Sequence, residues 1–596
     1  MWLRLPQRPL ELIGVSSKMD MHTAGGSTYH TMNKPPIFPR MHASNSAQRT
    51  FRLTVAMLAV AFVPKARSAA AGDLDSLNAP VFGDRVEATA VQPDGKTIIA
   101  GSFSSVLGVP RNNIARLNAD GTLDTGFNPN PNAFGYISSV ALQSDGKVLL
   151  GGNFTTLQPN DAPAATERSY IARVYANGTL DISFDPKPNA TVYSVAVQAD
   201  GKVLLGGHFT ALRPNGAAYA TARRHIARVN PDGTLDNEFD PNASSDVSTV
   251  AVQADGKVLL GGGFHTLQPK DATQVTTRNN IARVNANGSL DAGFNPNANS
   301  YIHCVAVQAD GRVLLGGYFT ALQPNGAALA TTRSRIARVN GDGTLDTGFD
   351  PKANNFVLSL AVQADGKVLL AGGFNTLQPN GAASAIPRNR IARVDADGTL
   401  DSGFNPNPNG VAYSVAAQAD GKVLLGGEFT ALQPNGSVSA TSRNLFARLV
   451  NDPATQSLTA QNAGQVSWTR GGSSPELGRV TFDLSTDNGA TWNALGASVR
   501  VGTTPNWELT GLALPASGQL RARGATRGGS ANGTSGLIQT VASFSGLTPF
   551  PYDIAVTGNS VTIIDGDSTP STADHTDFGS VNVNESPLVG TFYHHQ

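Results

Sequence analysis

The chain has 596 residues, enough for three or four domains, and its 63 Gly and 35 Pro indicate many turns rather than long helices. Its 44 basic and 44 acidic residues cancel, so no overall field attracts nucleic acid or an anionic membrane, and we expect no nucleic-acid partner. The single cysteine, Cys304, excludes an intramolecular disulfide framework and any cysteine-rich metal site, and we interpret it as a packing residue.

Residues 1–71 form an N-terminal extension that carries a targeting signal. Arg49 and Arg52 precede an apolar run from Leu53 to Val63, and the small-residue stretch "SAAAG" follows. This is the layout of a secretory signal peptide, and the run is too short to span a bilayer. We therefore expect translation to begin at Met41, export to the cell surface or the medium, and no transmembrane helix.

A repeated unit fills residues 72–450. Its Asp-Gly turns recur after one interval of 51 residues and then every 55, at Asp94, Asp145, Asp200, Asp255, Asp310, Asp365 and Asp420. In one unit "TVYSVAVQ", "KVLLGGHF", "HIARVNP" and "TLDNEF" are joined by the turns "ADG" and "DG" and one long loop, which predicts four strands. Strands that are apolar on both faces suit sheets covered by neighbours on both sides. We predict an all-β fold, a seven-bladed β-propeller with four-stranded blades.

The two ends of the repeat region indicate a closed ring. The seventh unit stops at "NLFARLVNDPAT" without a fourth strand, whereas "GDLDSLN", residues 72–78, precedes the first unit and matches the start of "GTLDTGFN". In an open solenoid, the alternative architecture, the surplus strand at one end and the missing strand at the other would lie far apart and could not pair. We therefore expect the N-terminal strand to close the last blade.

The doubled motif also carries a family resemblance. "DGKVLLGGHF" followed by "IARVNPDGTLDNEF" resembles the delta-60 repeat family of exported bacterial proteins, over roughly residues 72–450. The resemblance implies a β-propeller, and it brings no established activity and no catalytic residues.

Two arginines recur in every unit. One stands in the Ile-Ala-Arg motif, or Phe-Ala-Arg in the last unit, as Arg116, Arg173, Arg228, Arg283, Arg338, Arg393 and Arg448. The other lies five residues earlier, as Arg111, Arg168, Arg223, Arg278, Arg333, Arg388 and Arg443. They could form a basic ring for an anionic polymer. We favour pairing with the equally regular acids of the Asp-Gly turns and of the Leu-Asp motif, because guanidinium groups bind carboxylates in fixed geometry. The Leu-Asp acids are Asp75, Asp124, Asp181, Asp236, Asp291, Asp346 and Asp401.

Positions that change between otherwise identical units are the candidates for function. Seven residues before each turn aspartate lies what we call the first-strand set: Glu87, Ser138, Tyr193, Ser248, His303, Leu358 and Tyr413. Eight residues after it lies the second-strand set: Ser102, Asn153, His208, Gly263, Tyr318, Gly373 and Glu428. The start of the first strand and the end of the second are adjacent in an antiparallel hairpin. We therefore expect both sets, walled by the long loops, to line one mouth of the propeller.

The candidate ligand-binding residues of this mouth are Glu87, Asn153, Tyr193, His208, His303, Tyr318, Tyr413 and Glu428. Aromatic faces with polar tips suit a sugar or a peptide, so we expect a non-enzymatic module for an extracellular glycan, envelope component or protein. Drift at solvated positions would produce the same variability. Two other functions stay open: a carbohydrate-active enzyme that uses Glu87 and Glu428, whose units become neighbours in a closed ring, and a structural spacer.

We expect neither a metal ion nor a cofactor. The four propeller histidines, His208, His225, His265 and His303, fall in different repeat slots and lack the spacing of a helix-borne metal site. Links such as "FNPNPN" suit turns better than calcium ligands. The sequence contains no nucleotide-binding loop, nucleophile elbow or zinc-protease motif, and we assign no catalytic residue.

Two shorter regions follow the repeats. Residues 455–545 alternate like a small β-sandwich and resemble a fibronectin type III module, with Trp468, Trp492 and Trp507 expected in its core. Within it "STDNGATW" fits the Asp-box of sialidase propellers, which we interpret as a hairpin turn shaped by Asp487 and Gly489. Residues 548–596 resemble the opening of the choice-of-anchor D domain, an immunoglobulin-like module of bacterial surface proteins. They hold too few strands for a core, so we expect the sequence to be cut short there.

Overall fold

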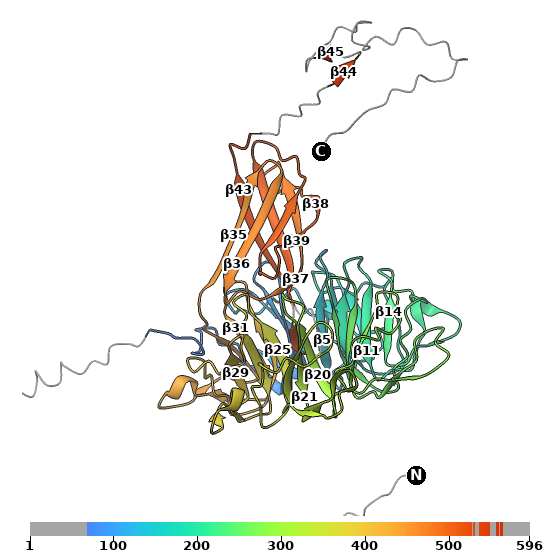
Figure 1. Cartoon of the computed structure of the whole chain (residues 1–596), viewed down its shortest axis with the longest axis vertical. Coiled ribbons are helices and arrows are strands. Elements are labelled where there is room, and N and C mark those ends of the chain that lie inside the picture. Colours follow the sequence, from blue (N-terminus) through green and yellow to red (C-terminus); the bar gives the residue numbers. More distant parts are fainter. Residues whose placement is uncertain (1–67, 527, 531–535, 549–555, 559–560, 564–596) are drawn as a thin grey trace, which may run out of the picture. The chain divides into compact units, whose positions relative to one another are not determined.

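The computed structural model describes residues 68–526, 528–530, 536–548, 556–558 and 561–563 (Figure 1). Of the predicted N-terminal extension with its signal peptide, residues 1–67 lie outside these ranges and residues 68–71 lie within them. Of the segment 548–596, only Thr548 and the paired strands β44 (Val556–Gly558) and β45 (Val561–Ile563) are described. Within the described ranges, no helix has the length and apolarity that a membrane crossing requires.

Each repeat unit forms one antiparallel sheet. In the third unit β10 (Val192–Val197) pairs with β11 (Val203–Gly207), which pairs with β14 (Ile226–Val229). The Asp-Gly turn between β10 and β11 is set by Gly201 at φ +81°, a backbone conformation that favours glycine. The same order of three strands recurs in β1 (Val81–Val91), β2 (Thr97–Val106) and β4 (Ile114–Leu117); β5 (Ile137–Leu142), β6 (Val148–Gly152) and β9 (Ile171–Val174); β15 (Val247–Val252), β16 (Val258–Gly262) and β19 (Ile281–Val284); β20 (Ile302–Val307), β21 (Val313–Gly317) and β24 (Ile336–Val339); β25 (Val357–Val362), β26 (Val368–Gly372) and β29 (Ile391–Val394); and β30 (Ala412–Ala417), β31 (Val423–Gly427) and β34 (Phe446–Leu449).

The fourth strand of each blade is shorter than predicted. In the third unit it amounts to one bridge, between Val229 and Leu235. Asp236 ends the pairing, because its carboxylate accepts the N–H of Glu238 at 3.0 Å and turns the chain away from the sheet. The fourth strand therefore lies where the sequence places it, with a single bridge as its extent.

The seven sheets close into a ring. Each first strand contacts the first strands of the two adjoining units, and β30 of the seventh unit contacts β1 of the first. Leu74 bridges to Leu449, in the place where the other blades have their own fourth strand. The prediction of a seven-bladed β-propeller closed by its N-terminal strand is confirmed.

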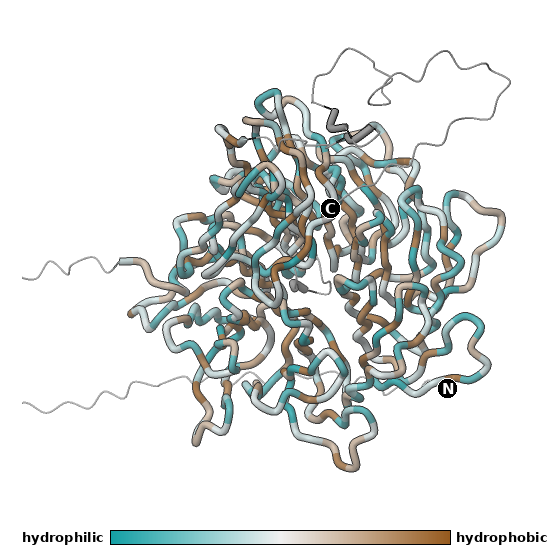
Figure 2. Tube along the Cα trace, turned by 45° about the horizontal axis from the view of Figure 1, so that its top comes forward, coloured by the Kyte–Doolittle hydropathy of each residue, from teal (hydrophilic) through white to brown (hydrophobic). Residues whose placement is uncertain are grey.

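The hydrophobic core lies between neighbouring blades. One cluster joins Leu204 and Ile226 of the third unit to Val250 and Leu260 of the fourth, and similar clusters recur around the ring. The buried hydrophobic residues of the repeat region lie mainly on the first three strands of each blade. Figure 2 shows hydrophobic and hydrophilic stretches alternating along the chain. Because both faces of each blade are covered, adjacent units must be alike in shape.

The recurring arginines brace the blades. Arg228 donates from Nε to Asp236 at 2.8 Å, donates from Nη1 to the carbonyl of Ala286 in the next unit at 2.6 Å, and covers the Phe239 ring. The same pairing with the Leu-Asp carboxylate occurs in all seven units and is confirmed. For the other row the expected acids are wrong: Arg168 is turned inward and donates to the carbonyls of Glu167 and Ile182. These arginines are therefore architectural.

Residues after the repeats form two four-stranded sheets around one core. One sheet contains β35 (Ala454–Asn462), β36 (Gln465–Gly472), β40 (Trp507–Thr510) and β39 (Val499–Arg500), and the other contains β38 (Asn493–Ala497), β37 (Leu477–Ser485), β41 (Gly518–Thr526) and β43 (Leu537–Phe544). Trp468 and Trp507 lie in the shared core. The expectation for Trp492 is wrong: it is only half-buried, and the guanidinium of Arg521 lies 4.3 Å from its ring centre.

The Asp-box segment forms the predicted turn. The Asp487 carboxylate accepts the hydroxyl of Thr491 at 2.6 Å, the N–H of Thr491 at 2.9 Å and the hydroxyl of Ser485 at 2.7 Å, and Gly489 has φ +87°. These hydrogen bonds lower the pKa of Asp487 to about 2.

One strand of the second region reaches the propeller. β42 (Gly528–Ser530), which follows β41, pairs with β25 from Ser359 to Ala361 and also contacts the first strands of three other blades. β42 therefore lies against four of the seven strands that surround the propeller axis.

Candidate functional site

The first-strand set surrounds a single cavity of about 350 Å³, which we call the mouth cavity. All seven members line it, together with three residues from other positions: Arg85, Tyr136 and Tyr301. The set converges because each member stands at the start of an innermost strand of the closed ring. Four tyrosines, a histidine, a leucine, two serines and one Arg-Glu pair thus face the same space.

The three additional residues belong to a position that sequence reasoning missed. It lies nine residues before each turn aspartate, and we call it the preceding set: Arg85, Tyr136, Thr191, Asp246, Tyr301, Phe356 and Val411. In most units it falls one residue before the first strand begins, outside the stretch in which alternation can be read. The spacing of two residues could have revealed this position, since residues i and i+2 of an extended chain lie on the same face and the first-strand set follows two residues later.

The second-strand set lies at the rim instead of in the cavity, which corrects the expectation for Asn153, His208, Tyr318 and Glu428. Their backbone groups pair with the preceding set, as in the hydrogen bond from the Tyr318 N–H to the Tyr301 carbonyl. Two of their side chains contact lining residues of the cavity: the rings of Tyr318 and His303 lie 5.0 Å apart, and the Tyr413 hydroxyl donates to Glu428 at 3.3 Å. The long loops do not contribute to the described cavity lining.

Most polar groups of the cavity are neutral at physiological pH. Burial raises the pKa of Tyr193 to about 12 and lowers that of His303 to about 4. Burial, helped by the charge of Glu428, also raises the pKa of Tyr413 to about 12. The exception is the ion pair in which Arg85 Nε lies 2.5 Å from Glu87 Oε1, so a positive and a negative group offset each other.

The two acids suggested for an enzyme occupy different layers. Glu87 lines the cavity and is held by Arg85, and burial raises the pKa of its carboxyl group against the opposing effect of the guanidinium. Glu428 lies exposed on the rim and accepts a hydrogen bond from Tyr413. Two residues lie between the acids. Arg85 pairs with Glu87, and its guanidinium lies 5.5 Å from the ring centre of Tyr413, whose hydroxyl donates to Glu428.

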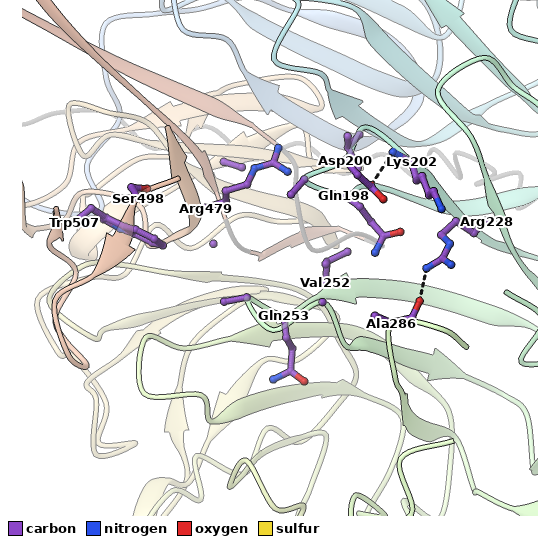
Figure 3. A pocket seen from close by; sticks show the side chains of 16 residues that line it. Gln198, Asp200, Lys202, Arg228, Val252, Gln253, Ala286, Arg479, Ser498 and Trp507 are labelled. Atoms are coloured by element: carbon purple, nitrogen blue, oxygen red, sulfur yellow. Dashed lines mark hydrogen bonds between the residues drawn. The ribbon is translucent and has the colours of Figure 1, made fainter. Parts of the chain in front are cut away.

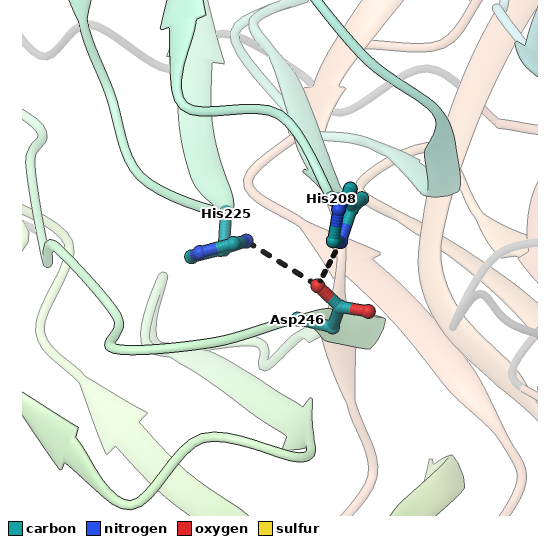
Figure 4. A group of neighbouring side chains, drawn as sticks. All are labelled: His208, His225 and Asp246. Atoms are coloured by element: carbon teal, nitrogen blue, oxygen red, sulfur yellow. Dashed lines mark hydrogen bonds and ion pairs between the residues drawn. The ribbon is translucent and has the colours of Figure 1, made fainter. Parts of the chain in front are cut away.

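Two of the four propeller histidines meet, which the sequence reasoning did not anticipate. His208 Nδ1 donates to Asp246 Oδ1 at 2.6 Å, and His225 Nδ1 lies 3.5 Å from the same oxygen (Figure 4). Their slots differ along the sequence but adjoin in space, because the second strand ends beside the start of the third: the Gly207 N–H donates to the His225 carbonyl. The predicted pairing of the second and third strands could have indicated that the two histidines are neighbours.

A second cavity lies at the Asp-Gly ends of the strands. It has a volume of about 480 Å³ and is lined by turn residues of the third and fourth units together with Arg479, Ser498 and Trp507 (Figure 3). Its propeller wall contains Lys202 and Arg228, which are engaged in the bracing pairs with Asp236. We therefore interpret this wall as architectural.

Comparisons with known proteins bear on the fold. Seven segments match the family model described as "Domain of unknown function (DUF5122) beta-propeller": residues 92–127, 143–184, 198–239, 253–294, 308–349, 363–404 and 418–450. Among solved structures, the WD40 beta propeller domain of Doa1 is similar at 15% identity and a TM-score of 0.42, over 64% of this chain and 98% of that chain. The Neurospora crassa Pan2 WD40 domain is similar at 10% identity and a TM-score of 0.36, over 63% and 96%. No curated protein matches. Since the seven matched segments coincide with the seven blades, the chain is a β-propeller repeat protein whose units are similar to this family model.

Proposed function

We propose that the chain is an exported, non-enzymatic binding protein whose mouth cavity holds an uncharged sugar ring of an extracellular glycan. The observation that carries the proposal is the chemistry of the cavity: Tyr136, Tyr193, Tyr301 and Tyr413 surround a space whose only described charged lining groups form one ion pair. Aromatic faces pack against the C–H faces of sugars, and hydroxyl groups exchange hydrogen bonds with theirs.

The size of the cavity supports the same ligand class. A volume of about 350 Å³ lies at the lower end of the usual range for small-molecule sites. The charges of Arg85 and Glu87 offset each other, so the cavity offers no free positive charge to an anionic ligand. An anionic group entering it would lose its hydration without gaining an ionic partner, which favours a neutral ligand over a polyanion. Their polar atoms can still exchange hydrogen bonds with a ligand.

Export rests on the signal-peptide pattern of the N-terminal extension. Such a location would place the mouth among envelope and matrix glycans. The open mouth cavity argues against a pure spacer, since a spacer has no need to keep aromatic side chains around an accessible space.

The test is a screen of the full chain against neutral and acidic glycans, peptidoglycan, lipopolysaccharide and peptides, followed by titration calorimetry of each hit. Tyr193→Ala and Tyr413→Ala each remove one aromatic wall and should weaken binding about 2- to 10-fold, since an aromatic contact contributes ~0.5–1.5 kcal/mol. The matched control is Tyr219→Ala, which removes an 86% exposed tyrosine of a loop. It should leave the affinity unchanged.

The outcomes separate the candidate functions. Binding of a neutral glycan that both cavity variants weaken supports the proposal. Cleavage of a bound glycan by the parent chain would establish the enzyme instead, and a peptide as the only ligand would overturn the sugar assignment. If none of the ligands binds, or if the cavity variants bind as well as Tyr219→Ala, the mouth is not the glycan site.

A further inference from the structure

We propose that His208, His225 and Asp246 form a binding site for a divalent transition metal ion such as Zn²⁺, at the rim of the mouth between the third and fourth blades (Figure 4). The ligand atoms of the three side chains lie within 4.8 Å of one another. Imidazole and carboxylate groups in this ratio are suited to zinc and its first-row neighbours, whereas calcium and magnesium prefer sites made of oxygen alone.

The three residues come from different elements that the propeller brings together. His208 follows β11, His225 precedes β14, and Asp246 precedes β15 of the next blade. One oxygen of Asp246 faces both histidines, with Nδ1 atoms at 2.6 Å and 3.5 Å. Ligands of a tetrahedral zinc ion lie about 3.3 Å apart, given bonds of about 2.0–2.1 Å. Small changes in side-chain angles would therefore bring all three to a common ion.

The other blade junctions provide an internal comparison, because the same three slots adjoin there too. At the fifth unit they hold Tyr318, Arg335 and Phe356, and the rings of Tyr318 and Phe356 lie 5.1 Å apart. At the fourth unit the residue in the place of His208 is Gly263, which lies against Tyr301. Among the seven junctions, all of which the structure describes, only the one after the third unit combines three metal-ligand side chains, so the shared framework does not explain this trio.

The surroundings leave the site accessible. His208 is 63% exposed in its side chain, which leaves an entry path and room for water or a ligand oxygen on the ion.

The experiment measures Zn²⁺ affinity by competition with a chromophoric chelator, and Co²⁺ binding by its absorption spectrum, on the full chain. Because His594 and His595 are adjacent in the sequence and could also bind metal, the parent and every variant carry His594→Ala and His595→Ala. His208→Ala and Asp246→Asn each remove one ligand; the second preserves the size of the side chain. His265→Ala, which removes an exposed histidine elsewhere on the fourth unit, is the matched control.

The expected result is one Zn²⁺ per parent chain and at least a 100-fold loss of affinity in both ligand variants, since changes even in the second shell of metal sites cost 10- to 100-fold. His265→Ala should bind like the parent, and the Co²⁺ spectrum should disappear only in the ligand variants. Circular dichroism of each variant separates loss of the site from loss of folding. The proposal is overturned if the parent binds no stoichiometric zinc, or if folded His208→Ala and Asp246→Asn retain the parent affinity.

Discussion

Removal of the Asp75 carboxylate should open the ring at its closing blade. Asp75 is 8% exposed, and its Oδ1 lies 2.6 Å from Nη2 and 2.7 Å from Nε of Arg448 and accepts the N–H of Leu77 at 2.9 Å. Asp75→Ala leaves the Arg448 guanidinium buried without its anion. Breaking such a pair costs ~3–5 kcal/mol when it is fully buried, and we expect ~3 kcal/mol here because Arg448 keeps some contact with water.

The assay is urea unfolding of the full chain followed by far-ultraviolet circular dichroism. Residues 72–450 contain no tryptophan, so tryptophan fluorescence recorded in the same samples reports on the region after the repeats. The control is Glu238→Ala, which removes an exposed surface ion pair with Lys270 and should cost under ~1 kcal/mol. If Asp75→Ala costs no more than Glu238→Ala, the N-terminal strand does not close the ring in the way we infer.

The cost of Asp75→Ala should also depend on pH. Burial alone would raise the pKa of Asp75, but the Leu77 N–H and the Arg448 guanidinium outweigh burial and hold it below the ordinary value of 3.8. A lowered carboxyl pKa stabilises the fold above the pKa of the unfolded chain, and this contribution is lost as the pH falls through the folded value. The difference between parent and variant should therefore shrink in acid.

Three further measurements test other parts of the structure. Burial raises the pKa of the Cys304 thiol, so native protein should resist iodoacetamide and become reactive only in urea; rapid alkylation of folded protein would contradict its place in the core. Burial lowers the pKa of His303 from 6.5 to about 4. Between pH 4 and pH 6.5 the unfolded chain therefore binds a proton at this residue that the folded chain does not bind. The free energy of unfolding should accordingly rise by at most ~3 kcal/mol as the pH increases from 4 to 6.5. His303→Asn should lack that rise, and an unchanged slope would refute the assignment. Nuclear magnetic resonance should find a pKa of about 2 for Asp487, and an ordinary value would mean that the Asp-box turn is not formed.

The repeats made the fold predictable. Seven near-identical units must bury the same faces against each other, and the strand missing after Leu449 matches the surplus strand around Leu74, so the residues alone indicate how the ring closes. Bracing by the arginines was predictable for the same reason: a charge that recurs at a fixed place needs a partner that recurs with it, as Asp236 does for Arg228. Periodicity did not predict the length of the fourth strand, which ends where an aspartate side chain captures a backbone N–H.

The candidate site was only half predictable. Alternation along the first strand placed Tyr193 and His303 correctly around the axis, but it stops where the strand begins, so Tyr301 and Asp246 were missed. His208 and His225 lie close together because the long loop between the second and third strands ends beside the point where it begins. The number of residues between the two histidines does not show this. The contact of β42 with the first strands was equally hidden, since no repeat links that segment to the propeller.

The most direct test of binding in the mouth cavity is to fill the cavity and measure the glycan affinity by titration calorimetry. Leu358→Trp adds a bulky ring inside the cavity, whereas Leu329→Trp adds the same ring at a residue that is 81% exposed in a loop. We predict that the folded Leu358→Trp variant loses the glycan and that Leu329→Trp binds it like the parent chain. Undiminished binding by folded Leu358→Trp would contradict the account and place the ligand elsewhere on the molecule.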